Sequence, residues 1–454
     1  MSSLSLLAAL WFAADPAASR VDVSGGAAIE VRGGWAPPAP QESAVPTVLV
    51  ILTPDVDMEV ESRRGTLFNL GYTPRVQHRE PNLLDADLPL LLHQAYATVR
   101  QPVDARWTLG VNLGGSVGEV GYNAAPEIIG DGADAPNVSR TEASVLQIAV
   151  GSAGLSAEGR LTRRHTLGLR TDIVYRTPLG IPEVTDDSQQ LSSAGIPEQL
   201  SINGAVSLDT RVSQADSVEV EVTPGYFDYN SGDTQFMTAQ AVGQWRRDIR
   251  PSLQSTVGAG VFGSAGLGNT RTDDVPVLPV ALASVTGGLV RSASHSVDAT
   301  LSAGLTPYFD RVQIDLSPRA TLNASVQVSL PPRWSIRGMV GAITNATRDP
   351  RAPRESLDGE STRPVTESQF RVALPVTYQI SDEQQFEFGL LATARAPHLA
   401  AEDFSLGQSE AWLYVAYRIG AGTARGGQEV GGGGQGAVTR STRGNSDAAS
   451  GGRR

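Results

Sequence analysis

The 454-residue sequence predicts an all-β protein, a transmembrane up-and-down antiparallel β-barrel. Three observations support this fold class. Apolar and polar side chains alternate over segments of about ten residues, and short polar turns alternate with longer connections. No run of residues approaches the ~18 consecutive apolar residues that a membrane helix needs. The longest apolar run, Val45–Pro54, is short and bracketed by prolines.

The N-terminal segment has the pattern of an export signal. An apolar stretch from Leu4 to Ala14 is followed by small residues at Ala17 and Ala18, so residues 1–19 are predicted to be a signal peptide. The positively charged region that normally opens such a peptide is missing. A misplaced start codon or a buried N-terminal helix are the alternatives.

Period-two alternation is clearest between Ala320 and Leu330, where apolar residues occupy every second position and Thr, Asn, Ser and Gln fill the others. A strand points successive side chains to opposite faces, so this segment has one apolar and one polar face. The same pattern recurs around Leu167–Tyr175, Val206–Val212, Val218–Val222, Val297–Leu305, Phe370–Ile380 and Phe386–Ala392.

Short polar turns are expected at eight places, and each pair of turns is separated by a longer connection rich in Gly, Pro, Asp and Asn. The turns are 63–65, 103–106, 163–165, 214–216, 247–250, 292–294, 331–333 and 381–383. The longer connections include 121–140, 177–200, 263–276, 345–366 and 397–409.

The turn count predicts the number of strands. Eight turns join sixteen strands, and Ala411–Ile419 adds a closing strand whose partner we expect within Val21–Arg32. The barrel is therefore predicted over residues 20–420 with about 18 strands, and 16 is the next expectation. Residues 421–454 are Gly-rich and are predicted to be a disordered periplasmic tail, without which the chain still assembles.

Soluble all-β folds are the competing interpretation. A propeller needs a repeat of ~40–50 residues, and no internal repeat is visible. Trp107, Trp245 and Trp334 all lie beside short turns, as expected for an aromatic girdle at one membrane interface. A polar face along each strand also needs water, which the lumen of a wide barrel supplies.

Alternation assigns many charged residues to this polar face. The pore-lining candidates are Arg75, Arg170, Arg211, Arg319, Arg337, Arg371, Arg395, Arg418, Asp57, Glu59, Glu61, Glu219 and Glu221. Asp172, Asp209, Asp298 and Glu387 fall on the same face. Arginines concentrate between Arg319 and Arg418, which suggests opposed basic and acidic walls and a transverse field that biases ion passage. The alternative is that these charges pair with one another in a plugged barrel.

Composition and motifs argue against several other functions. A net charge of −12 argues against nucleic-acid binding, and the absence of cysteine excludes thiolate chemistry. The five histidines are scattered and no HExxH, GxSxG, Walker A or EF-hand motif occurs, so we expect no enzyme, no cofactor and no metal site. Acidic loop pairs such as Asp131/Asp134 are expected to be solvated.

With these features the chain resembles a bacterial outer-membrane β-barrel, and the closing segment AWLYVAYRIG, Ala411–Gly420, carries part of that resemblance. The resemblance implies contact with outer-membrane lipid, lipopolysaccharide and the barrel-assembly machinery. It also implies a water-filled channel for small hydrophilic solutes. TonB-dependent transporters are not favoured, because no N-terminal plug of ~150 residues precedes the strands. Two alternatives remain in the membrane, an export barrel for an anionic polysaccharide and a closed structural or adhesive barrel. A soluble secreted β-protein is the third.

Overall fold

A computed structural model describes residues 20–36, 44–62, 64–80, 89–121, 145–180, 198–229, 234–267, 277–292, 295–310, 315–348, 364–398 and 408–420. The predicted signal peptide at 1–19 and the predicted tail at 421–454 lie outside these residues. Within the described part, no helix is long and apolar enough to cross a membrane.

The regular structure consists of nineteen strands. They are β1 (Arg20–Ala36), β2 (Val45–Glu61), β3 (Leu67–Tyr72), β4 (Arg75–Glu80), β5 (Leu90–Pro102), β6 (Trp107–Gly121), β7 (Val145–Arg160), β8 (His165–Gly180), β9 (Gln199–Arg211), β10 (Asp216–Tyr229), β11 (Thr234–Arg250), β12 (Leu253–Leu267), β13 (Leu278–Arg291), β14 (Ser296–Asp310), β15 (Asp315–Leu330), β16 (Trp334–Arg348), β17 (Pro364–Ser381), β18 (Gln384–His398) and β19 (Gln408–Gly420).

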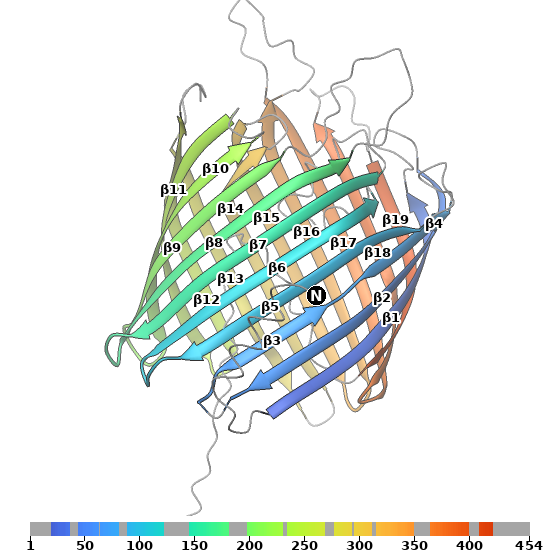
Figure 1. The fold of residues 1–454 in the computed structure, drawn as a ribbon, viewed down its shortest axis with the longest axis horizontal. Helices are drawn as coiled ribbons and strands as arrows, with labels where there is room; N and C mark the ends of the chain where they lie inside the picture. Colours follow the sequence, from blue (N-terminus) through green and yellow to red (C-terminus); the bar gives the residue numbers. More distant parts are fainter. Residues whose placement is uncertain are drawn as a thin grey trace, which may run out of the picture.

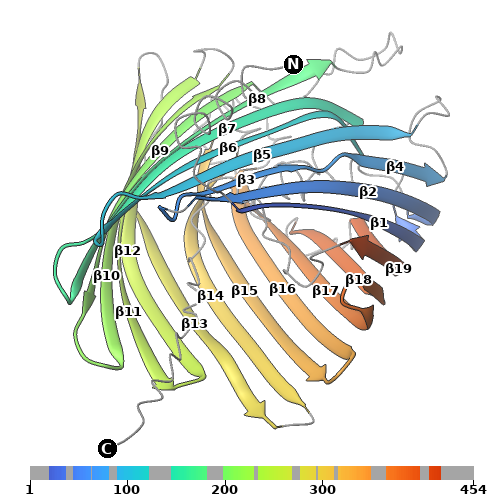
Figure 2. The ribbon, with the colours of Figure 1, turned by 60° about the horizontal axis from the view of Figure 1, so that its bottom comes forward.

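The strands form one antiparallel sheet that closes on itself, because β1 pairs both with β2 and with β19 (Figures 1 and 2). β3 and β4 both lie between β2 and β5 and are separated at Thr73 and Pro74, where proline has no N–H to donate. These two short strands share one place in the ring. The barrel therefore has eighteen positions, which confirms the predicted fold class and strand number.

The predicted first and last strands are both present. The partner expected within Val21–Arg32 is β1, and it pairs with β19 from Gly26 opposite Gly420 to Trp35 opposite Ala411. The turn predicted at 247–250 was wrong in position. β11 continues to Arg250 through an irregularity at Asp248, and the chain reverses at Pro251 and Ser252.

Most strands have 13 to 18 residues and are longer than the predicted ten. The segments with alternating apolar side chains are only the part of each strand whose outer face lies in apolar surroundings. The ends continue the backbone ladder beyond it, where apolar side chains are no longer required.

The eight turns lie along one edge of the barrel, named here the short-turn rim (Figure 1). At one of them the Asp104 carboxylate accepts hydrogen bonds from the backbone N–H groups of Arg106 and Trp107, at 2.6 and 2.8 Å. These two donors stabilise the charged form and lower the pKa of Asp104 below its ordinary value. The opposite edge is named the long-connection rim.

Neighbouring turns are joined by backbone hydrogen bonds. The N–H of Arg160 donates to the carbonyl of Arg106, the N–H of Arg211 to that of Arg164, and the N–H of Asp248 to that of Ala215, at 2.8–2.9 Å. The short-turn rim is therefore a continuous structure around this part of the barrel.

Candidate functional site

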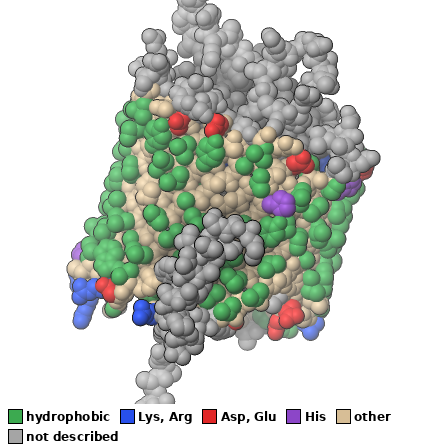
Figure 3. All heavy atoms as spheres, in the orientation of Figure 1, with side chains coloured by type: hydrophobic (Ala, Val, Ile, Leu, Met, Phe, Trp, Pro, Cys, Tyr) green, Lys and Arg blue, Asp and Glu red, His purple; other side chains and the backbone are tan. Residues whose placement is uncertain are grey.

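The wall has an apolar outer face and a mixed inner face. In β19, Trp412 is 2% exposed and its neighbour Leu413 is 69% exposed, because successive side chains point to opposite faces. Exposed Val, Leu and Ile side chains recur at every second position, and they cover the outer face between the rims (Figure 3). Residues paired across strands share a face, so the register assigns every other position from these two.

The acidic candidates on β2 lie on the inner face. Asp57 accepts a hydrogen bond of 2.6 Å from the hydroxyl of Tyr96, and Glu59 lies opposite Asn69. Glu61 ends the strand at the short-turn rim, where it is exposed. This acidic stripe on β2 therefore lies on the short-turn half of the inner face.

The acidic stripe on β10 is partly neutralised. Arg246 of β11 forms ion pairs with Glu219 and with Asp209, and Glu221 accepts a hydrogen bond from Thr223 at 3.2 Å. Pairing of this kind was the alternative to a transverse field, and it applies to these residues.

A second inner pair lies on β8. Arg170 is 2.8 Å from Asp172, which stands two residues away on the same strand and the same face. The pair joins two sequence-predicted lumen residues into one neutral unit. It adds little to any field across the lumen.

The basic candidates between β15 and β19 are mostly accessible. Arg337, Arg371 and Arg418 occupy inner-face positions and are exposed. Arg319 also lies on this face, but it is buried near the long-connection rim. The side chain of Arg395 lies outside the described residues. Contact of these arginines with a passing solute stays a prediction.

The two remaining basic candidates lie on β9 and β4. Arg211 donates to the backbone carbonyls of Ser213 and Gln214, at 3.1 and 3.2 Å, and so stabilises a short turn. Arg75 is half-buried opposite Leu92. The sequence analysis predicted only that both arginines line the lumen.

The arrangement of walls corrects one expectation. In a ring of eighteen positions each strand faces the one nine positions away, so the β10 stripe faces β19 and its Arg418. The β2 stripe, in contrast, is separated from β19 only by β1. Only one of the two acidic stripes therefore opposes the arginine wall (Figure 2).

The inner face is not polar along every strand, and that prediction was wrong. Trp412 packs with Ala36, Leu49 and Ile51 on β19, β1 and β2. A second apolar cluster joins Val242, Phe262 and Val280 of β11, β12 and β13. The two clusters lie on opposite sides of the ring (Figure 2).

Coverage of the inner face changes along the barrel axis. Inner side chains toward the long-connection rim are largely buried, and most inner side chains toward the short-turn rim are half-buried or exposed. The buried set includes Thr47, Leu49, Gln77, Arg79, Leu92, Arg176, Gln199, Phe236, Gln240, Val280, Arg319 and Trp412. The accessible part of the lumen is thus its short-turn half.

Sequence reasoning missed several inner arginines, two of which are buried. Arg79 lies opposite Leu49 and Arg176 lies opposite Gln199, both on the inner face and both buried. Continuing the alternation from Arg75 and from Arg170 would have included them. No cluster of His, Asp or Glu suited to a metal ion occurs among the described side chains.

No known family profile matches the sequence, and no curated protein matches it. Several solved structures have a similar fold. The siderophore receptor PirA from Pseudomonas aeruginosa is 8% identical over 88% of this chain and 80% of its own, with a TM-score of 0.43. The FrpB iron transporter from Neisseria meningitidis is 9% identical over 87% and 69%, with a TM-score of 0.49.

The outer membrane protein OpdK from Pseudomonas aeruginosa is 11% identical over 88% of this chain and 99% of its own, with a TM-score of 0.44. Sequence identities and TM-scores this low do not indicate what the present chain binds or transports. The closed wall and its apolar outer band are nevertheless those of a bacterial outer-membrane β-barrel, since only a closed barrel satisfies every strand edge in lipid.

Proposed function

We propose that this protein is a channel that passes small hydrophilic solutes across the outer membrane. The observation that carries the proposal is the exposure of charged inner side chains, above all Arg337 and Arg418, inside a wall whose outer face is apolar. Charged groups in such a place need water around them. A barrel of 16–18 strands is wide enough to hold a water-filled lumen.

Recordings from refolded protein in a planar bilayer test the proposal directly. We expect stepwise single-channel currents at ordinary salt concentrations. Protein that resists SDS when unheated, and so is folded, but inserts without any conductance would contradict the channel and favour a closed structural barrel.

Charge reversal tests whether the lumen carries the current. The double change Arg337→Glu and Arg418→Glu should shift the reversal potential toward cation selectivity, because both side chains lie on the inner wall. The control is Arg333→Glu, at the short-turn rim and on the outer side. An equal shift in both proteins would mean that surface charge alone sets the selectivity.

One observation supports a second candidate function, export of an anionic polysaccharide. Gln327 lies opposite Arg337, and Gln385 lies opposite Arg418, on the inner faces of β15 to β19. Amides beside guanidinium groups suit a chain that has both hydroxyl and carboxylate groups. Oligomers of an acidic polysaccharide should then block the current at concentrations where neutral dextran of equal length does not. Equal block by both polymers would contradict polysaccharide export and leave the small-solute channel as the remaining proposal.

A further inference from the structure

Arginines gather at the short-turn rim, although the chain as a whole has a net charge of −12. They lie in or next to seven of the eight short turns: Arg64, Arg106, Arg163, Arg164, Arg211, Arg247, Arg250, Arg291 and Arg333. Figure 3 shows arginine side chains along this edge of the viewed face. Carboxylates such as Asp104 and Asp248 lie at the same edge, but arginines outnumber them among the described residues, so the rim has a net positive charge where the wall leaves the hydrocarbon layer.

Two of these cations rest on outward-facing aromatic rings. The guanidinium of Arg247 lies 5.8 Å from the centre of the Trp245 ring, and both residues occupy outer positions of β11. Trp245 is 44% exposed and the Arg247 side chain 55%. A guanidinium in this position is held over the face of the ring while its outer edge stays open.

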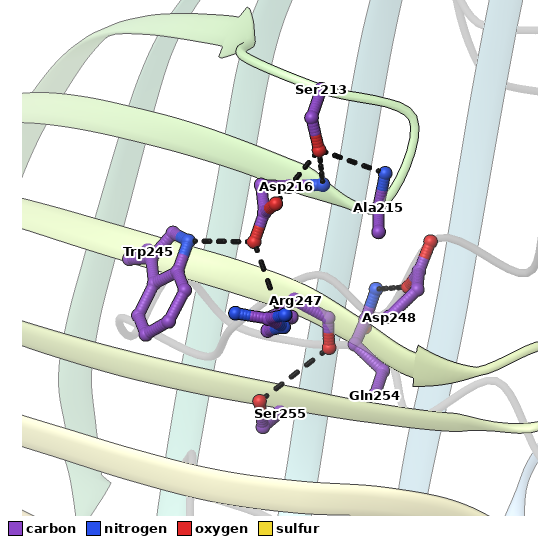
Figure 4. Close-up of polar contacts among 8 residues, drawn as sticks. All are labelled: Ser213, Ala215, Asp216, Trp245, Arg247, Asp248, Gln254 and Ser255. Atoms are coloured by element: carbon purple, nitrogen blue, oxygen red, sulfur yellow. Dashed lines mark hydrogen bonds and ion pairs between the residues drawn. The ribbon is translucent and has the colours of Figure 1, made fainter.

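Asp216 fixes this arrangement from the neighbouring strand (Figure 4). Its carboxylate accepts the indole N–H of Trp245 at 3.2 Å and the hydroxyl of Ser213 at 2.7 Å. The Nε of Arg247 is 3.9 Å from the same carboxylate, beyond hydrogen-bond distance. Asp216 therefore orients the indole and attracts the cation without occupying its N–H donors.

The second platform is built from β17 and the turn before β16. Arg333 lies 6.0 Å from the centre of the Tyr378 ring and donates to its hydroxyl at 3.0 Å. Trp334 packs against the same ring at 4.6 Å and is 44% exposed. The construction repeats that of Arg247, with a different aromatic residue and no carboxylate partner among its described contacts.

The outer face at the long-connection rim has the opposite character. There the hydroxyls of Tyr175 and Tyr226 donate to the carboxylates of Glu198 and Asp228. Among the side chains that the structure describes, no arginine occupies the outer face at this rim. Outer aromatic residues thus lie beside arginines at the short-turn rim and beside carboxylates at the long-connection rim. The two edges therefore present opposite charges to the two leaflets.

We propose that the short-turn rim binds the phosphate headgroups of anionic phospholipids, with Arg247 and Arg333 as the contact cations. A guanidinium offers a planar pair of donors that matches phosphate oxygens, and the ring beneath it packs against the lipid's glycerol and upper acyl region. Short turns of such barrels face the periplasm, so the lipids are those of the inner leaflet. This inference does not depend on conduction through the lumen.

Lipid quenching of tryptophan fluorescence tests the proposal on the full chain. Wild-type protein and the double variant Arg247→Gln, Arg333→Gln are reconstituted into vesicles of phosphatidylcholine and phosphatidylglycerol. The relative association of the two lipids is read from quenching by the brominated form of each. Wild type should favour phosphatidylglycerol, and the double variant should lose about fivefold of that preference for each arginine.

Arg337→Gln is the matched control, because the same chemical change is made on the inner face and should leave lipid preference unaltered. Migration in unheated SDS gels confirms that each protein is folded. An equal loss in the control would assign the preference to overall charge and overturn the proposal. Equal association of both lipids with wild type would also overturn it and would favour a soluble acidic partner for the rim.

Discussion

The two halves of the inner wall face the same lumen and differ in how far their side chains are covered. Toward the long-connection rim, Leu49, Arg79 and Trp412 are almost fully buried. Toward the short-turn rim, Gln327 and Arg337 are exposed. The inner wall is therefore a packed interior at one end and a solvated surface at the other, and we expect substitutions to affect stability at the first and selectivity at the second.

Removing the largest buried side chain tests the packed half. Trp412→Ala deletes a side chain that contacts Leu49 and Ile51, and should lower the free energy of unfolding by about 3–5 kcal/mol. Urea unfolding in detergent, followed by SDS-gel mobility, measures the loss. The adjacent Leu413→Ala, on the outer face, should cost less than about 1 kcal/mol. Equal losses would mean that the inner cluster contributes no packing of its own.

Breaking the charge cluster of Asp209, Glu219 and Arg246 on β9, β10 and β11 should have an intermediate effect. Arg246→Met leaves Glu219 and Asp209 without their cation, so unfolding should become easier by about 1–3 kcal/mol. The two carboxylates should also shift the reversal potential toward cations. A stability loss with no electrical change would place this charge cluster away from the ion path.

Cysteine labelling compares the two halves without a large change in stability. The chain has no native cysteine, so Gln327→Cys and Gln240→Cys each provide one thiol on the inner face. The exposed position 327 should react on the order of tenfold faster with a membrane-impermeant thiol reagent than position 240, which is 6% exposed in the wild type. Similar rates would contradict the difference in coverage.

The smallest effect is expected at the turn held by Asp104. Its pKa is lowered in the folded state, so its contribution to stability is present above the unfolded pKa and is lost as the pH falls through the folded value. Asp104→Ala should slightly lower the unfolding temperature at neutral pH, and the difference from wild type should disappear in strong acid. A difference that persists in acid would point to the turn's backbone shape instead.

Much of the fold could be predicted because a barrel wall repeats one local rule. Alternation and turn spacing predicted the number of strands, and the need for an even number predicted a strand within Val21–Arg32, which is β1. The turn near Arg250 was misplaced because Arg247 and Asp248 are polar residues that continue a strand at the rim. Polar residues indicate contact with water, and the end of a strand at the rim contacts water just as a turn does.

The lumen could be predicted only in part, for a physical reason. Alternation identifies Trp412 and Arg319 as inward-facing, but coverage depends on what lies on the other side of the side chain. Nothing in the local sequence of β19 says that Leu49, far away in the chain, packs against Trp412. The relation of the two acidic stripes to the arginines likewise required the order of strands around the ring.

The pairing of β1 with β19 has a consequence for how the wall forms. Gly26 lies opposite Gly420, so this contact has the longest sequence separation of any strand pairing described. The other seams join strands that are near one another in the chain and can form locally, whereas this one must bring the two ends of the barrel sequence together and has the largest single loop-closure cost. Until β19 is in place, two full-length edges have unpaired N–H and C=O groups, which cannot be left in lipid. Assembly should therefore be limited by one late, long-range step, and a partly folded sheet has no stable place in the bilayer.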